Sequence, residues 1–216
     1  MTATHDSKNL FLPGPAGGLE AVLWTPPARV QPRFAAVVCH PHPLFGGTMH
    51  NKVVYQTAKA LDAHPAAVLR FNFRGTGLSE GGHDRGQGER GDVRAALHFL
   101  AENFAGLPLV LAGFSFGSWV GLRVGCEDAR VKRLIGIGAP VNSSDFSYLE
   151  SCPKPKLFVH GSEDEFGDIS KLEKIVGGLP GENKLVVVSG VDHFFKGKIE
   201  ELGKAVAAWM DNWPVA

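Results

Sequence analysis

The sequence Leu109-Val-Leu-Ala-Gly-Phe-Ser-Phe-Gly-Ser-Trp-Val-Gly-Leu122 decides the fold. Apolar residues of strand type lead into it, and an apolar run typical of a helix follows. Between them, Ser115 stands in the pattern G-x-S-x-G, flanked by Gly113 and Gly117. This pattern is typical of a nucleophile elbow, a sharp turn that projects a serine hydroxyl above a sheet. A glycine-rich loop with a surface serine is the alternative, and the flanking strand and helix patterns favour the elbow.

Strand and helix patterns alternate along the rest of the chain. Phe34–Cys39 is a continuous apolar run of the kind buried on both faces of a parallel sheet. Further strands are expected at 66–72, 133–139, 156–160 and 184–188, and helices at 49–63, 92–104, 169–176 and 195–213. This alternation predicts an α/β fold with a mostly parallel sheet, helices on both faces and a ligand crevice at the carboxyl ends of the strands.

The N-terminal part has a different pattern. Two short apolar runs at 10–12 and 19–24 are joined by the turn-rich sequence Pro13-Gly-Pro-Ala-Gly-Gly18, which predicts an antiparallel hairpin at an edge of the sheet. No linker interrupts the chain, so residues 1–216 are predicted to form a single domain. The only room for a cap is residues 141–155, so we expect a small lid at most and an open site.

The composition excludes several classes of partner. The 216 residues include 22 basic and 22 acidic ones, so no net field favours nucleic acid or an anionic membrane. The three cysteines are far apart, which indicates reduced thiols and no disulfide framework, and none has the spacing of metal ligands. The N-terminus has no apolar signal region, and no run of 18 apolar residues occurs. We therefore expect a cytoplasmic protein with no metal or cofactor and no nucleic-acid or membrane partner. Its small-molecule substrate must be argued from the site, and the sequence leaves a monomer and a homodimer equally open.

A serine hydroxyl needs a base to remove its proton, and His193 is the best candidate. It follows directly after the last expected strand, at the end of the sheet where Ser115 should lie. Its ordinary pKa is close to neutral pH. Other histidines fit less well, because His98 falls within a helix, His83 lies in a glycine-rich polar loop, and His160 closes a strand, where packing or support of the site is expected.

An acidic group that orients this histidine should lie in the loop after the strand 156–160. The sequence His160-Gly-Ser-Glu-Asp-Glu-Phe166 offers three carboxylates, of which Asp164 is the best placed to turn back toward His193. The order serine, aspartate, histidine is the order expected for an elbow of this kind. Asp192 is the main rival, but neighbours in an extended chain point apart. Asp168 is interpreted as a helix cap.

Hydrolysis through a tetrahedral intermediate also needs two backbone N–H donors for the oxyanion. Phe116, at the start of the elbow helix, should supply one. The other should come from the loop after Cys39, in which Pro41 and Pro43 have no N–H. The candidates are therefore His42, Leu44 and Phe45, and we favour Leu44. The spacing of His40 and His42 suggests a metal pair, but no third ligand is evident, so a rigid loop is the preferred interpretation.

Together with the elbow, two further stretches of the chain resemble motifs of the α/β-hydrolase superfamily. They are His40-Pro-His-Pro-Leu-Phe-Gly-Gly-Thr-Met-His-Asn51 and Phe71-Asn-Phe-Arg-Gly-Thr-Gly-Leu-Ser79, which look like those of small, cap-less, dienelactone-hydrolase-like bacterial carboxylesterases. The resemblance implies an eight-stranded sheet, with seven strands possible, whose second strand is antiparallel. It also implies a triad on Ser115, Asp164 and His193 and an oxyanion donor at Leu44. Dienelactone hydrolases proper use cysteine where this chain has serine, which favours ordinary esters as substrates.

The sequence hypothesis is a serine carboxylesterase that cleaves esters with short acyl chains. We expect the side chains of Phe45, Phe146 and Phe194 to bind substrate. Arg74 is expected to hold neighbouring loops together through its fork of donors. A thioesterase or peptidase with the same triad is one alternative. A binding protein without turnover on the same fold is another.

Overall fold

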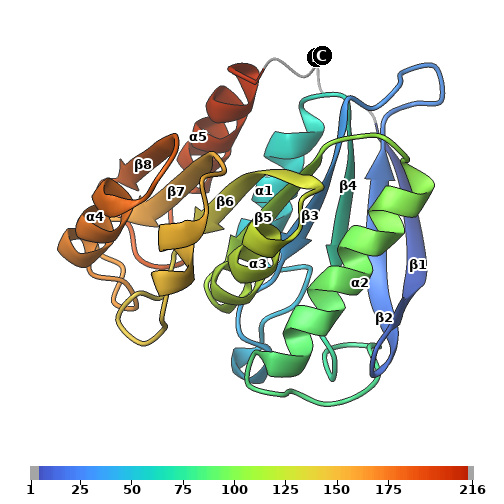
Figure 1. Ribbon diagram of the computed structural model, residues 1–216, viewed down its shortest axis with the longest axis horizontal. Helices are drawn as coiled ribbons and strands as arrows, with labels where there is room; N and C mark the ends of the chain where they lie inside the picture. The colour runs from blue at the N-terminus through green and yellow to red at the C-terminus, as the bar shows by residue number, and fades with distance from the viewer. Residues whose placement is uncertain (1–4, 214–216) are drawn as a thin grey trace.

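An eight-stranded sheet forms the centre of the molecule in the computed structural model, which describes residues 5–213. The strands lie in the order β1-β2-β4-β3-β5-β6-β7-β8 (Figure 1). They are β1 Asp6–Gly14, β2 Gly17–Thr25, β3 Phe34–Cys39, β4 Ala66–Phe71, β5 Leu109–Phe114, β6 Val131–Ile137, β7 Lys156–Gly161 and β8 Asn183–Val188. β2 runs antiparallel to both of its neighbours, β1 and β4, and all other neighbouring strands are parallel. The predicted mostly parallel sheet is therefore confirmed, with eight strands.

Helices cover both faces of this sheet (Figure 1). They are α1 Lys52–Asp62, α2 Gln87–Asn103, α3 Phe116–Glu127, α4 Ile169–Gly178 and α5 Ile199–Asp211, with short 3₁₀ helices η1 Pro43–Phe45 and η2 Ser147–Ser151. Apolar side chains of α2, α3 and α4 pack in one core layer, and those of α1 and α5 pack in the other. No helix between residues 5 and 213 is both long and apolar enough to cross a membrane.

The central strands are fully buried, and apart from Arg70 in β4 their sequences are apolar. Every residue of β3, β4 and β5 is buried, as expected for strands covered on both faces. The hairpin β1–β2 lies at an edge of the sheet, as predicted, and its strands are longer than the apolar runs alone indicate. The start of α2 differs from the prediction by more than the ends of these strands do. The helix begins at Gln87, five residues before the predicted start at Asp92. The carboxylate of Glu89 thereby falls in the first turn of the helix.

The segment between β6 and β7 contains no cap domain. Residues 141–155 form a loop and η2, which lies against α3. Trp119 Nε1 in α3 donates a hydrogen bond to the carbonyl of Asp145 at 3.0 Å, and the Tyr148 hydroxyl donates to the carbonyl of Trp119 at 3.0 Å. These two bonds hold the segment beside the elbow helix, so it forms one wall of the site without covering it.

Candidate active site

The backbone of Ser115 is strained in the way an elbow requires. Its φ of 54° and ψ of −120° lie outside the regions that an L-residue normally occupies. The turn is fixed by the Ser115 N–H, which donates to the carbonyl of Ile137 at 2.9 Å, and by the Ser115 carbonyl, which accepts from the Ser118 N–H at 2.8 Å. A Cβ at Gly113 would collide with the Gly117 carbonyl, and a Cβ at Gly117 with the backbone of β3. Both glycines are therefore required by close packing around the turn.

The predicted base and acid are in direct contact. His193 Nδ1 lies 2.7 Å from Asp164 Oδ2, and both side chains are almost completely buried. The other carboxylate oxygen of Asp164 accepts the N–H of Phe166 at 2.9 Å, which fixes its orientation. With Nδ1 directed at Asp164, Nε2 is the ring nitrogen that remains for a proton from a third group. Gly138 leaves room for this ring, because a Cβ there would lie 3.0 Å from His193 Cε1.

The rival carboxylates have other roles. Asp192 Oδ1 accepts the N–H groups of Phe194 and Lys196, both at 3.0 Å, and so closes the turn after β8. Asp168 Oδ1 accepts the Lys171 N–H at 3.0 Å, which confirms the predicted cap of α4. Of the carboxylates considered from the sequence, Asp164 is the one that the fold brings to the histidine ring.

His160 supports Asp164 from behind. Its ring is fully buried, and Nε2 lies 2.7 Å from the carbonyl of Gly167 and 3.5 Å from Asp164 Oδ2. Burial lowers the pKa of His160, so the neutral ring is favoured. A neutral ring with its proton on Nε2 donates to the Gly167 carbonyl and faces the carboxylate. This agrees with the supporting role expected for His160.

Ser115 and His193 line one open cavity of about 650 Å³. The walls are mostly apolar and include several aromatic rings, and they come from loops at the carboxyl ends of the strands. Among the predicted substrate contacts, Phe45 and Phe194 line it. Phe146 does not, because it is buried in the core beside Tyr148 with a ring-centroid distance of 5.9 Å, so that prediction is wrong. The lining residues that the sequence analysis did not single out for substrate include Asn51, His83, Arg85, Asp145 and Phe166.

The loop after β3 corrects the predicted oxyanion donor. The N–H of Leu44 donates to His42 Nδ1 at 3.2 Å, and the amides of residues 45 and 47 donate to the His42 carbonyl, both at 3.1 Å. The residue 46 amide donates to the Pro43 carbonyl at 3.2 Å. Leu44 is therefore the wrong choice, because its N–H already donates to the His42 ring and it is not among the residues that line the cavity. Within residues 5–213 the His42 amide has no hydrogen-bond acceptor, and it belongs to a residue that lines the cavity.

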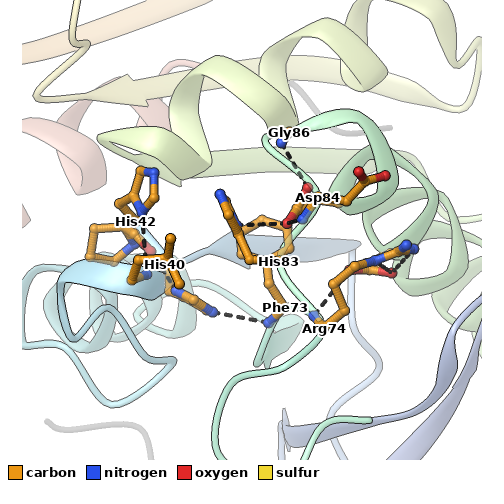
Figure 2. Close-up of polar contacts among 11 residues, drawn as sticks. His40, His42, Phe73, Arg74, His83, Asp84 and Gly86 are labelled. Atoms are coloured by element: carbon orange, nitrogen blue, oxygen red, sulfur yellow. Dashed lines mark hydrogen bonds and ion pairs between the residues drawn. The ribbon is translucent and has the colours of Figure 1, made fainter. Parts of the chain in front are cut away.

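A buried histidine fixes this loop. His40 Nδ1 lies 2.6 Å from the carbonyl of Pro41, and Nε2 lies 2.9 Å from the N–H of Phe73 (Figure 2). Because Nε2 faces an N–H donor, it must accept, and the proton is on Nδ1. Burial lowers the pKa of His40 to about 4, so the ring stays neutral. His40 is therefore part of the loop framework, as the sequence interpretation expected, and it is not half of a metal pair.

Arg74 joins the next loop to α2. Its Nε and Nη2 donate to the carboxylate of Asp92, with the shortest distance 2.7 Å from Nη2 to Oδ1 (Figure 2). The Arg74 N–H also donates to Asp92 Oδ2 at 3.1 Å. The predicted structural role of Arg74 is confirmed, because the fork of donors is directed at a buried carboxylate and away from the cavity.

Comparisons with known proteins agree with this fold. The family model described as alpha/beta hydrolase domain matches residues 35–212, so the chain belongs to the α/β-hydrolase family. An α/β serine hydrolase homologue from Coxiella burnetii is 36% identical, with a TM-score of 0.88 over 94% of this chain and 97% of that one. A serine hydrolase without a lid from Xanthomonas campestris is 35% identical, with a TM-score of 0.89 over 96% and 95% of the two chains. An uncharacterized protein of Rickettsia prowazekii is 36% identical over 84% of each chain.

Proposed function

We propose that the protein is a serine carboxylesterase that cleaves esters with short acyl chains through an acyl-enzyme. The observation that carries this proposal is the contact of 2.7 Å between Asp164 and His193 beside a strained serine in the same cavity. An aligned carboxylate holds the imidazole in the tautomer whose Nε2 can accept a proton. This is the arrangement that makes a serine hydroxyl a nucleophile at neutral pH.

The reaction follows from these positions. Ser115 Oγ attacks the ester carbonyl while His193 Nε2 takes its proton, and Asp164 stabilises the resulting imidazolium. The carbonyl oxygen becomes an oxyanion, for which the amides of His42 and Phe116 are the proposed donors. Collapse of the intermediate expels the alcohol, which receives the proton from His193. Water then attacks the acyl-enzyme by the same route and releases the acid.

The shape of the cavity supports a small ester. It is open, because residues 141–155 form a wall beside α3 and no cap domain covers the entrance within residues 5–213. A long acyl chain would extend into solvent and gain little from burial there. The aromatic walls favour an apolar group on at least one side of the ester.

Hydrolysis of p-nitrophenyl acetate by the parent protein and by Ser115→Ala tests the proposal. We expect the substitution to lower kcat by about 10⁴ to 10⁶ with an unchanged circular dichroism spectrum. A fluorophosphonate should label Ser115 in the parent, because only an activated serine reacts. Equal turnover by both proteins, or no labelling, would refute the proposal. Matched ester, thioester and amide substrates then separate an esterase from a thioesterase or peptidase.

A further inference from the structure

A second carboxylate–imidazole pair lies beside the cavity, formed by Glu89 and His83. Glu89 is fully buried, and its two oxygens accept the N–H groups of Asp84 and Gly86, each at 2.8 Å (Figure 2). Its Oε1 also lies 2.9 Å from His83 Nδ1. A buried carboxylate needs such partners. The loop before α2 is therefore folded around this carboxylate, and the His83 ring lies beside it at ion-pair distance, without the alignment of a hydrogen bond.

The His83 ring reaches the part of the cavity next to the nucleophile. Its centroid lies 4.8 Å from that of His42 and 5.6 Å from that of Phe116, the residue that follows Ser115. Both histidines line the cavity, and their rings extend in the same direction in Figure 2. Since Nδ1 of His83 is buried beside Glu89, Nε2 is the polar atom that this ring offers to a ligand.

Arg85 brings a full positive charge to the same wall. It is exposed, it lines the cavity, and within residues 5–213 its guanidinium has no hydrogen-bond or ion-pair partner. Its φ of 51° is left-handed, a conformation that costs a non-glycine residue of order 1 kcal/mol. The compact turn around Glu89 imposes this conformation. An unpaired cation beside an imidazole backed by a carboxylate is suited to bind an anion.

The acidic residues of this region have partners of their own. Asp145 lines the cavity, but its carboxylate accepts the N–H of Ser147 at 2.9 Å and the Ser147 hydroxyl at 3.0 Å, and it lies 3.7 Å from Arg123. The Asp84 side chain points away from His83 in Figure 2. These carboxylates do not neutralise the guanidinium of Arg85 through any direct contact in the described residues.

The position of the leaving group places the acyl group of the ester at the end of the cavity that contains His83 and Arg85. His193 protonates the leaving alcohol in the proposed function, so the alcohol lies on its side of the nucleophile. The rings of Phe166 and Phe194 are found there, with centroids 4.6 Å and 5.2 Å from that of His193. The acyl group then extends the other way, across Phe116 toward His83.

We propose that His83 and Arg85 bind a free carboxylate on the acyl group, so that the preferred substrates are monoesters of dicarboxylic acids. The Arg85 guanidinium would donate to the carboxylate oxygens, and Nε2 of His83 would be the second polar contact of the same group. This inference rests on the proposed function for the direction of the ester. The cluster of His83, Arg85 and Glu89 is the observation that carries it.

Two esters of equal length test the preference. The 4-nitrophenyl monoester of glutaric acid carries a terminal carboxylate where 4-nitrophenyl valerate carries a methyl group. After subtraction of the uncatalysed rates, we expect the parent protein to show a kcat/KM at least tenfold higher for the glutarate monoester. This ratio should fall toward one in His83→Gln and in Arg85→Gln. Lys59→Gln, which removes a charge from α1 away from this cavity, should retain the parent's ratio and controls for long-range attraction.

A binding measurement keeps the two proposals separate. Calorimetry with Ser115→Ala should show at least tenfold tighter binding of the glutarate monoester than of the valerate, and adding Arg85→Gln should remove the difference. If the parent hydrolyses both esters with a ratio of one or less, the carboxylate inference fails and the esterase proposal stands. If neither ester is hydrolysed, the esterase proposal fails and the calorimetric comparison decides the inference. Equal affinities for the two esters would overturn it.

Discussion

Asp164 Oδ2 and His193 Nδ1 lie 2.7 Å apart although 29 residues separate them in the sequence. The contact forms because each residue follows a strand, β7 or β8, and these strands are parallel neighbours whose carboxyl ends meet at one edge. The pair is buried, so its hydrogen bond is strong and its loss leaves an unpaired polar group. Substitution of Asp164 should therefore affect activity far more than substitution of the other acidic residues of its loop.

Asp164→Asn should lower kcat for p-nitrophenyl acetate by about 10³ to 10⁴, because an amide that donates to Nδ1 favours the wrong tautomer of His193. The side chain keeps its size, so the fold should persist. Glu163→Gln is the matched control, since Glu163 is an exposed neighbour in the same loop, and it should retain the parent's activity. A similar loss in both variants would contradict the assignment.

Gly113→Ala should destabilise the protein by about 3 kcal/mol, because the added Cβ would collide with the Gly117 carbonyl at the core of the elbow. Gly177→Ala is the control within a helix. Its Cβ would meet nothing within 4 Å, and alanine favours the helix by about 0.5 to 1 kcal/mol. Urea unfolding followed by circular dichroism measures both changes. If Gly113→Ala unfolds at the parent's midpoint, the packing argument for the elbow is wrong.

The elements that were predicted best from the sequence are those in which nearly every residue is buried. The apolar run Phe34–Cys39 predicted a covered strand, and the strand and helix patterns on either side of Ser115 predicted the strand-to-helix turn that the structure contains. The placement of Asp164 beside His193 was also predicted from the sequence, because the distance of Asp164 from the end of a strand allows the loop to turn back.

The parts that were missed depend on contacts between loops. Leu44 was preferred over His42 because no pattern in the sequence shows that the His42 ring caps the Leu44 amide. His83 was set aside because it lies in a glycine-rich polar loop, and its neighbour Glu89 was not included in the predicted helix. Glu89 follows Gly86 by three residues, and its carboxylate accepts the Gly86 N–H. That spacing of a capping glutamate was the available signal for the earlier start of α2.

The stability of the protein should fall between pH 6.5 and pH 4 through His40. Burial lowers the pKa of His40 from 6.5 to about 4, so in this range the unfolded chain binds a proton that the folded protein does not. The contribution is fully present above pH 6.5 and is lost as the pH falls to 4, a change of about 3 kcal/mol. Burial also lowers the pKa of His160, which acts in the same direction.

Urea unfolding of the parent and of His40→Gln at several pH values tests this contribution. Glutamine keeps one donor and one acceptor but does not titrate, so we expect the variant to be less stable at pH 7 and to lose less stability on acidification. The difference in slope should approach one proton near pH 5. Parallel curves for the two proteins would show that His40 does not carry the effect.

Phe166→Ala and Phe194→Ala should weaken the hydrolysis of aryl esters more than that of ethyl esters. Both rings lie beside His193, where the leaving group is protonated in the proposed function. A p-nitrophenyl group packed between them loses apolar contact when either ring is removed, which should raise KM by about three- to tenfold, equivalent to about 1 kcal/mol. An ethyl group is too small to contact both rings, so kcat/KM for ethyl acetate should change less.

Phe11→Ala is the control, because Phe11 is 57% exposed on the edge strand β1 and its loss should affect neither substrate. Equal losses for the aryl and ethyl esters would place the leaving group elsewhere in the cavity, and with it the acyl group.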